Sequence, residues 1–279
     1  MKEKNKLLYD TNEKPPVGKW IILAIQHVFA MFGATILVPI LVNKIANAEV
    51  LTIPVALVAS GIGTLIYILC TKGKSPVYLG SSFAYITPIA LAYERGGLSG
   101  FVTGIVGVGI VYILFALLIK IFGKNWVNKL LPPIVVGPMI MIIGLSLASN
   151  AVSQIGLTAT GFEWKSLVVA LVAFLVTALT AVGAKGFLKV IPFLIGITSG
   201  YIMSVILGIV DFQPVIDASF FEVPKFLLPI RDYTFSFVGL LTIAPIALVT
   251  IAEHIGDHMA LSTIIDKDLI KDPGLEKHY

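Results

Sequence analysis

The sequence predicts an all-α polytopic membrane protein, and three observations lead there. Of the 279 residues, 57% are hydrophobic and 13% are charged, with a mean hydropathy of +0.95, whereas a soluble domain carries about 25% charged residues. The apolar residues lie in runs of about 20, the length that a helix needs to cross roughly 30 Å of hydrocarbon. The lysines alternate between successive loops. We therefore expect lipid to be the solvent of this chain.

Eight apolar segments follow one another along the chain, and short polar loops separate them. They cover residues 20–42, 51–70, 77–93, 98–122, 134–148, 166–183, 190–209 and 235–262. Because each is long enough for a crossing or nearly so, we expect about eight transmembrane helices. Residues 1–19 and 263–279 are predicted to be polar tails, and residues 210–234 an extracellular connection.

The distribution of Lys and Arg predicts the orientation of these crossings. Of the twenty basic residues, fifteen fall on one side, namely Lys2, Lys4, Lys6, Lys14, Lys19, Lys72, Lys74, Lys120, Lys124, Lys129, Lys185, Lys189, Lys267, Lys271 and Lys277. The other five are Lys44, Arg95, Lys165, Lys225 and Arg231. Since cytoplasmic loops are enriched in Lys and Arg, both termini are predicted to be cytoplasmic. The net charge of +4 is explained in this way, and we expect no nucleic-acid partner.

The third segment is predicted to be broken in the middle of the membrane. Its stretch from Tyr78 to Tyr85 contains Gly80, Ser81 and Ser82, and Pro88 follows. Non-helical backbone at that depth persists only where it is buried in protein or lines a cavity, and discontinuous segments bind substrate in secondary transporters. A kinked helix that packs through its small residues is the alternative.

A short repeat predicts an inverted topology. Gln26, His27 and Val28 of the first segment have their counterpart in residues 253–255 of the eighth, where the sequence is Glu-His-Ile. Seven crossings separate the two, so these helices run in opposite directions, as in inverted repeats. The chain then holds the first repeat and the first helix of the second. His27 is either a packing residue or, with Gln26, part of a site.

The eighth segment carries four ionisable residues close together, which are Glu253, His254, Asp257 and His258. A charged side chain at mid-bilayer is unfavourable by roughly 2.5–3.5 kcal/mol, so such groups face protein or water. Glu253 and Asp257 share one helix face. Burial favours the neutral form of a carboxylic acid, which could then carry a proton and both donate and accept a hydrogen bond. We expect His258 to be solvated at the membrane surface.

A zinc hydrolase is the hypothesis from another class. Residues 254–258 (HIGDH) resemble the H-x-x-E-H zinc motif with Asp in place of Glu. Two histidines spaced by four residues can hold zinc, with the acid as the base. A third ligand is missing from this pattern, because His27 lies in a different span and His278 in the tail. We therefore expect no metal, no other cofactor and no enzymatic activity.

Five stretches resemble the uracil permease branch of the nucleobase and ascorbate transporters. These are Gln26 to Pro39, Gly61 to Leu65, Tyr78 to Ile86, Ala252 to Gly256 and Lys267 to Leu275. They follow one another in family order over nearly the whole chain. The purine and ascorbate branches differ at most of these positions, so the resemblance implies uracil as the substrate, with a purine such as xanthine as the alternative.

The resemblance also implies a fold and an activity. Spans in 20–122 and 235–262 would form a core domain, and spans in 134–209 a gate domain. The core would hold uracil between the broken third and tenth spans with the eighth alongside, and would import it with a proton across the cell membrane. The family doubles a seven-span repeat to about fourteen spans. A chain that ends after the eighth is expected to be truncated and inactive alone, whereas the full-length protein could be a homodimer.

Residue by residue, Glu253 is similar to the family's glutamate that bonds the uracil edge. Phe83 is similar to the aromatic residue whose segment contacts the base, and Gly80, Ser81 and Ser82 shape the short extended strand of that segment. Where some bacterial members have a histidine, this chain has Asp257. The resemblance therefore implies that proton coupling is distributed over Glu253, Asp257 and His254, with Gln26 and His27 in support.

Overall fold

The computed structural model describes most of the chain. It covers residues 9–10, 13–123, 126–127, 132–146, 148–158, 161–185, 188–189, 191–219, 223–224, 226, 233–274 and 277–278. Within these residues the regular structure is almost entirely helical, and the described strands are two residues each. The prediction of an all-α membrane protein is confirmed.

The chain divides into two compact units. Unit 1 consists of Met1–Pro15, Gly33–Ile143 and Pro224–Tyr279, and unit 2 consists of Pro16–Phe32 and Gly144–Val223. Each unit is described by itself. The boundaries of a core and a gate domain stay a prediction.

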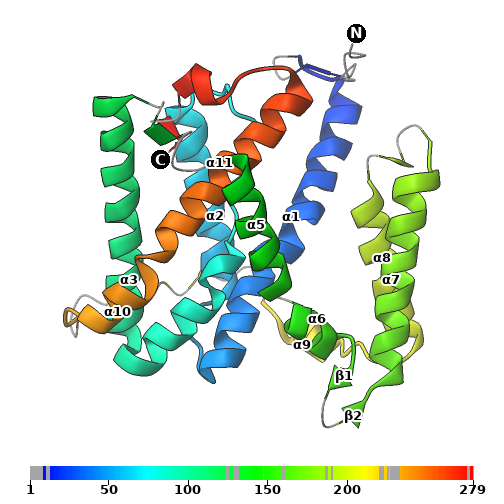
Figure 1. The fold of residues 1–279 in the computed structure, drawn as a ribbon. Coiled ribbons are helices and arrows are strands. Elements are labelled where there is room, and N and C mark those ends of the chain that lie inside the picture. The colour runs from blue at the N-terminus through cyan, green and yellow to red at the C-terminus, as the bar shows by residue number, and fades with distance from the viewer. Residues whose placement is uncertain are drawn as a thin grey trace. The chain divides into compact units, whose positions relative to one another are not determined.

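Unit 1 contains the helices that carry most of the residues singled out in the sequence. In chain order these are the second half of α1 (Val17–Ala46), α2 (Ile53–Cys70), η1 (Phe83–Tyr85), α3 (Ile86–Phe122), α5 (Pro133–Ser146), α10 (Phe237–Ile243), α11 (Ile246–Ile265) and the short turn η3 (Ile270–Gly274) (Figure 1).

Helix α3 bends sharply at Gly97. Its 37 residues would make a straight helix of about 55 Å, far longer than the hydrocarbon layer. At Gly97 the backbone leaves the helical region, with φ 57° and ψ −153°, a conformation open mainly to glycine. Figure 1 shows the change of direction. The bend lies between the predicted third and fourth segments.

The third segment is broken as predicted. Residues 74–82 are not helical, Ser82 has extended backbone angles (φ −88°, ψ 130°), and helix begins only at Phe83. The described β-structure pairs only β1 with β2, so a short strand at this break stays a prediction.

Small residues bring α10 into close contact with α3. A Cβ atom added to Gly239 would lie 2.1 Å from the carbonyl oxygen of Gly100, and one added to Gly104 would lie 2.5 Å from Ile243. Membrane helices use such small residues to approach each other closely. A turn at Ala244 and Pro245 then leads into α11, because proline cannot supply the N–H that a continuous helix needs.

An apolar cluster packs α11 against the end of α3. It is formed by Phe115, Ile119, Val127, Ile251 and Ile255, all at most 6% exposed. This cluster and the α3–α10 contact fix the eighth segment within unit 1. The side chains on the other faces of α11 are thereby held at defined positions.

Unit 2 contains a pair of membrane-length or nearly membrane-length helices and several shorter elements. In chain order these are the first half of α1, α6 (Ala148–Gln154), the antiparallel strands β1 (Leu157–Thr158) and β2 (Gly161–Phe162), α7 (Trp164–Gly183), α8 (Pro192–Ile206) and α9 (Gln213–Asp217). Helices α7 and α8 pack through glycine, since a Cβ atom at Gly196 would lie 1.8 Å from Thr177 Oγ1.

Five helical stretches among the described residues are long and apolar enough to cross a membrane. They are Val17–Ala46, Ile53–Cys70, Phe83–Phe122, Trp164–Gly183 and Phe237–Ile265, and Pro192–Ile206 is a shorter apolar helix. Each of the eight predicted segments overlaps a helix, although residues 77–82 of the third are not helical, and the exact number of crossings stays a prediction. Several predicted loop residues lie outside the described residues, namely Lys2, Lys4, Lys6, Lys124, Lys129, Lys225 and Arg231, as do parts of the tails and of the 210–234 connection.

Candidate functional site

The non-helical part of the third segment lines a cavity of about 350 Å³ in unit 1. The walls come from α1, α2, the extended segment and α3. The lining residues are Val38, Leu51, Ala56, Ala59, Ser60, Leu79, Gly80, Ser81, Ser82, Tyr85, Ile89, Phe101 and Ile105. The cavity is therefore mostly apolar, with hydroxyl and backbone groups supplied by the broken segment.

Hydrogen bonds to two neighbouring helices hold the extended segment in place. The backbone N–H of Leu79 donates to Thr64 Oγ1 of α2 (3.0 Å), and Ser81 Oγ donates to the carbonyl oxygen of Thr35 in α1 (3.2 Å). A Cβ atom at Gly80 would lie only 3.3 Å from Thr35 Oγ1. The backbone polar groups that the break exposes are thus partly satisfied by side chains, as membrane depth requires.

Ser82 presents a buried hydroxyl to this cavity. Its Oγ has no hydrogen-bond partner among the described residues. A buried polar atom without a partner is unfavourable by about 1–3 kcal/mol and is rare enough to need a specific explanation. Among the predicted site residues, Ser82 and Gly80 line the cavity.

A tyrosine pair connects the cavity to α11. Tyr85 Oη lies 2.9 Å from Thr250 Oγ1, and Tyr112 Oη donates to the same oxygen at 2.6 Å. Thr250 Oγ1 in turn donates to the carbonyl oxygen of Ala247 (3.1 Å). Because a hydroxyl has one proton and two lone pairs, both tyrosines act as donors. Tyr85 also lines the cavity, so the network ties the broken segment to the eighth one.

Glu253 follows Thr250 by one helical turn. It is half-buried and lies within electrostatic range of Tyr85 and Tyr112. In the part of the chain that the structure describes, its carboxylate makes no hydrogen bond or ion pair. Asp257, one turn further, is exposed. The two acids share a helix face as predicted.

Phe83 opens the turn η1 and is half-buried. It is not among the residues that line the 350 Å³ cavity.

Gln26 and His27 belong to unit 2, where Gln26 is half-buried and His27 is exposed. The supporting role of both residues stays a prediction.

A second polar cluster surrounds the histidines of α11. Tyr67 Oη lies 2.7 Å from His258 Nε2 and 2.6 Å from His278 Nδ1, and Ser75 Oγ lies 3.1 Å from His258 Nε2. The His254 and His258 rings are 4.1 Å apart between centroids. We call these five residues the histidine cluster.

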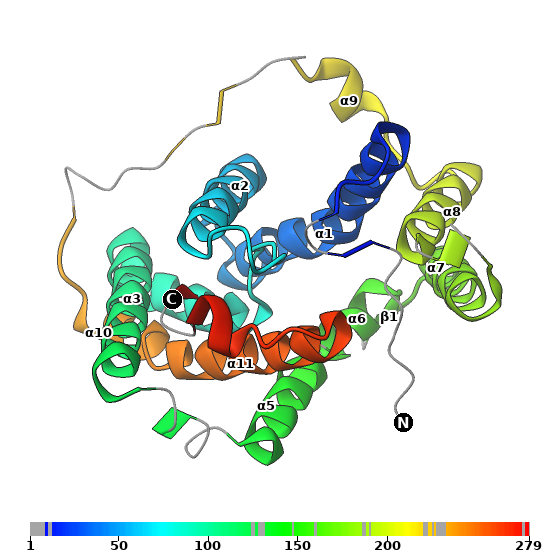
Figure 2. The same ribbon diagram turned by 90° about the horizontal axis from the view of Figure 1, so that it is seen from above.

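The histidine cluster corrects two predictions. His258 was expected to be solvated, but it is only 1% exposed, because the C-terminal segment folds back beside α2 and α11 and covers it (Figure 2). His278 was expected to be too far away to act as a third ligand. Its ring lies 4.3 Å from that of His258, so the reason given for excluding a metal site was wrong.

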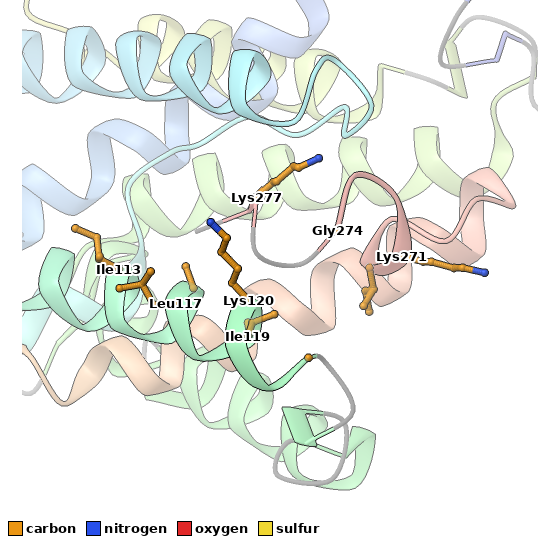
Figure 3. Close-up of a pocket in the computed structure, with 10 residues that line it drawn as sticks. Ile113, Leu117, Ile119, Lys120, Lys271, Gly274 and Lys277 are labelled. Carbon is orange, nitrogen blue, oxygen red and sulfur yellow. The ribbon is translucent and has the colours of Figure 1, made fainter.

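A larger cavity of about 780 Å³ lies at the end of α3. Its walls carry three lysines, Lys120, Lys271 and Lys277, and otherwise apolar or small residues. In Figure 3, Lys271 extends away from Lys120 and Lys277. None of the predicted substrate residues lines this cavity, so its size does not make it the substrate site.

The sequence analysis missed Tyr85, Tyr112, Thr250, Tyr67 and Ser75. Thr250 carried a usable signal, since it lies three residues before Glu253 and therefore on nearly the same helix face. The tyrosines gave no such signal. Their hydroxyls meet partners more than a hundred residues away in the chain, which no local pattern reveals.

The sequence model of the Permease family matches residues 18–279. The chain belongs to this family. Among its relatives in the Permease family are two proteins named uracil permease, from Bacillus subtilis (strain 168), 45% identical, and from Bacillus caldolyticus, 47% identical. Each alignment covers 98% of this chain, and 63% and 62% of the respective relative. A uracil permease of Escherichia coli (strain K12) is 40% identical over 95% of this chain and 60% of its own length.

The chain spans just over three fifths of the length of the Bacillus relatives that it matches. Membership of the Permease family and the apolar helices make it a multi-pass membrane protein.

Proposed function

We propose that this chain is part of a transporter that imports uracil together with a proton. The observation that carries the proposal is the 45–47% identity to uracil permeases along 98% of the chain. The structure supports it independently, because a cavity, a broken membrane segment and an unpaired carboxylate occur together in unit 1 among the described residues.

The cavity suits a small planar ligand. Its volume of about 350 Å³ is at the lower end of the range of roughly 300–1,000 Å³ for small-molecule sites. We assign Ser82 Oγ and the backbone at Gly80 as hydrogen-bonding groups for the base, because Ser82 Oγ is buried without a described partner. Phe83 follows Ser82 directly in the chain and is proposed to contact the ring face, although it does not line the cavity in this structure.

Glu253 is the proposed ligand for the imide edge of uracil and the proposed proton carrier. A protonated carboxyl donates one hydrogen bond and accepts another, which complements the adjacent C=O and N–H of an imide. Asp257 lies on the same face and is exposed, so it is suited to pass the proton to water. His254 is a weaker candidate, because its ring packs against His258 and Tyr67 instead.

The proposed setting is the cell membrane, with both termini of the chain in the cytoplasm and the full-length protein paired as a homodimer. The lysine distribution supports the orientation. A purine such as xanthine is the alternative substrate. A zinc hydrolase is not favoured by membership of a permease family.

The test uses a chimera in which residues 1–279 replace the aligned part of the Bacillus subtilis uracil permease, so that the relative supplies the remaining spans. Cells without their own uracil uptake would express it, and labelled uracil inside the cells would be measured. We expect saturable accumulation above the outside concentration that a protonophore abolishes and that unlabelled uracil, but not xanthine, suppresses.

The parent permease in the same cells is the control for expression and for the energised state. Accumulation that xanthine suppresses more strongly than uracil would replace the substrate assignment. Uptake that only equilibrates across the membrane, with or without the protonophore, would contradict proton coupling.

A further inference from the structure

We propose that His254, His258 and His278 form a binding site for a zinc ion. One ring nitrogen from each residue lies within 4.8 Å of the others. The two histidines of α11 have the i,i+4 spacing of helical zinc ligands, and the third comes from the C-terminal segment. This inference does not depend on whether the chain transports uracil.

Backbone carbonyls determine which ring nitrogen of His258 and of His278 carries the proton. His258 Nδ1 donates to the carbonyl oxygen of His254 (2.8 Å), and His278 Nε2 donates to that of Leu269 (3.1 Å). A carbonyl only accepts, so the lone pair of each neutral ring lies on the other nitrogen. Histidine ligands of metals are typically oriented in this way, with the second N–H bonded to a carbonyl or carboxylate.

The two lone pairs then converge on one point. His258 Nε2 and His278 Nδ1 lie 2.7 and 2.6 Å from Tyr67 Oη. A phenol has one proton and can satisfy only one of them, and Ser75 Oγ is the donor in reach of the other. Two imidazole nitrogens that face the same position are the start of a coordination sphere. Tyr67 Oη occupies this position in the structure, so a bound ion requires the hydroxyl to move aside, and the hydroxyl is then the oxygen closest to the fourth coordination position.

The distances are compatible with a zinc ion after small side-chain movements. Tetrahedral zinc with Zn–N bonds of about 2.0–2.1 Å separates its ligand nitrogens by about 3.3 Å. The largest separation of 4.8 Å exceeds this by about 1.5 Å. Rotation of the imidazole rings about their side-chain torsions can close this gap without moving the helix.

The donor set selects the class of metal. Three neutral imidazoles suit Zn²⁺ and related transition ions, whereas Mg²⁺ and Ca²⁺ require oxygen ligands. Among the described residues, two acids are adjacent in sequence to these histidines: Glu253, which is half-buried, and Asp257, which is exposed. His258 and His278 are 1% and 6% exposed, which gives the enclosed surroundings of a structural site. A bound ion would join α11 to the C-terminal segment beside the end of α2.

The test is zinc binding to the purified 279-residue chain in detergent, with a removable tag free of histidine. After dialysis against buffered zinc, elemental analysis should find one zinc ion per chain. His258→Asn and His278→Asn should each weaken binding about 100-fold or more, since even indirect ligand partners contribute 10–100-fold. His27→Asn is the matched control, because His27 lies in unit 2, and it should bind like the wild type.

A second measurement avoids variants that fail to fold. X-ray absorption at the zinc edge of the wild-type chain should show three imidazole ligands at about 2.0 Å and no sulfur, since Cys70 is exposed elsewhere on α2. Zinc absent from the wild type, zinc retained by both variants, or a shell without imidazoles would overturn the proposal.

Discussion

Two polar regions lie on the same helix, α11, and they differ in how their polar atoms are satisfied. Around His258, ring nitrogens, hydroxyls and backbone carbonyls pair with one another at 2.6–3.1 Å. The Glu253 carboxylate, by contrast, has no hydrogen bond or ion pair among the described residues, and neither does the hydroxyl of Ser82 in the broken segment. The two regions are only about one turn apart.

The difference indicates two uses of ionisable residues in a membrane helix. The hydrogen bonds among Tyr67, Ser75, His258 and His278 strengthen the packing of the chain, because an unpaired polar group in low-dielectric surroundings is destabilising. A carboxylate without hydrogen-bond partners in a membrane helix lowers stability, and such a residue is typical of a position that binds a ligand. We therefore assign the histidine cluster to structure and the Glu253 region to transport.

The largest effect on stability is expected from Tyr67→Phe. Removal of the hydroxyl leaves one donor, Ser75 Oγ, for two buried imidazole nitrogens. One unsatisfied buried acceptor should lower the free energy of unfolding by about 2 kcal/mol. The measurement is the thermal midpoint of the purified chain in detergent with EDTA present, so that no metal contributes. Tyr201→Phe is the control, since Tyr201 is 53% exposed. Equal midpoints for both variants would show that the cluster is not stabilising.

A somewhat smaller effect, on uptake, is expected from Ser82→Ala. Loss of a hydrogen bond to the base should raise the uracil concentration for half-maximal uptake by the chimera about tenfold, equivalent to about 1.4 kcal/mol. Stability should not fall, because the Ser82 hydroxyl has no described partner to lose. Ser204→Ala is the control, since Ser204 lies in unit 2, outside the cavity lining, and its Oγ donates to the carbonyl oxygen of Gly200. An unchanged half-maximal concentration for Ser82→Ala would remove this residue from the site.

A small effect of opposite sign is expected from Glu253→Leu. Because a partly buried carboxylate is replaced by an apolar side chain, the free energy of unfolding should rise by up to about 1 kcal/mol. The thermal midpoint of the 279-residue chain is again the measurement. A marked fall in the midpoint would mean that Glu253 has structural partners, which would remove the contrast with His258.

The smallest effect is expected from the exposed ion pair of Lys74 with Asp272, whose N–O distance is 2.5 Å. The hydrogen bond from Lys74 holds the pKa of Asp272 below its ordinary value of 3.8. When the pKa of a carboxyl is lower in the folded chain than in the unfolded chain, its ionised form stabilises the fold at a pH above the unfolded-state pKa. This stabilisation is lost as the pH falls through the folded-state pKa. Asp272→Asn should therefore lower the midpoint slightly at pH 7, and the difference should shrink as the pH falls below the ordinary carboxyl pKa of 3.8. A difference that persists in acid would contradict the ion pair as its cause.

The sequence predicted the helical segments and the break in the third one because both depend on local composition. Apolar runs mark the crossings, and Gly80 with its neighbouring serines marks the break. Glu253 stood out because an acid in an apolar span is unusual. These features needed no knowledge of the tertiary contacts.

The partners of these residues could not be predicted in the same way. Tyr67 and His278 are 211 positions apart, and a hydrophobic pattern does not encode which distant hydroxyl meets which ring. The merging of two predicted spans into α3 depends on the backbone angles of Gly97. The burial of His258 depends on the return of the C-terminal segment, which composition alone marks only as polar.

The most direct test of the assignment compares Glu253→Gln with Tyr67→Phe in the chimera. Uracil uptake would be measured as a function of pH and divided by the amount of each variant in the membrane. The glutamine keeps the shape of the glutamate but cannot titrate, so we expect a loss of uptake of about 100-fold or more, whereas Tyr67→Phe should transport normally per molecule. Normal uptake by Glu253→Gln with unchanged pH dependence, or an equal loss in Tyr67→Phe, would contradict the division of α11 into a transport region and a structural one.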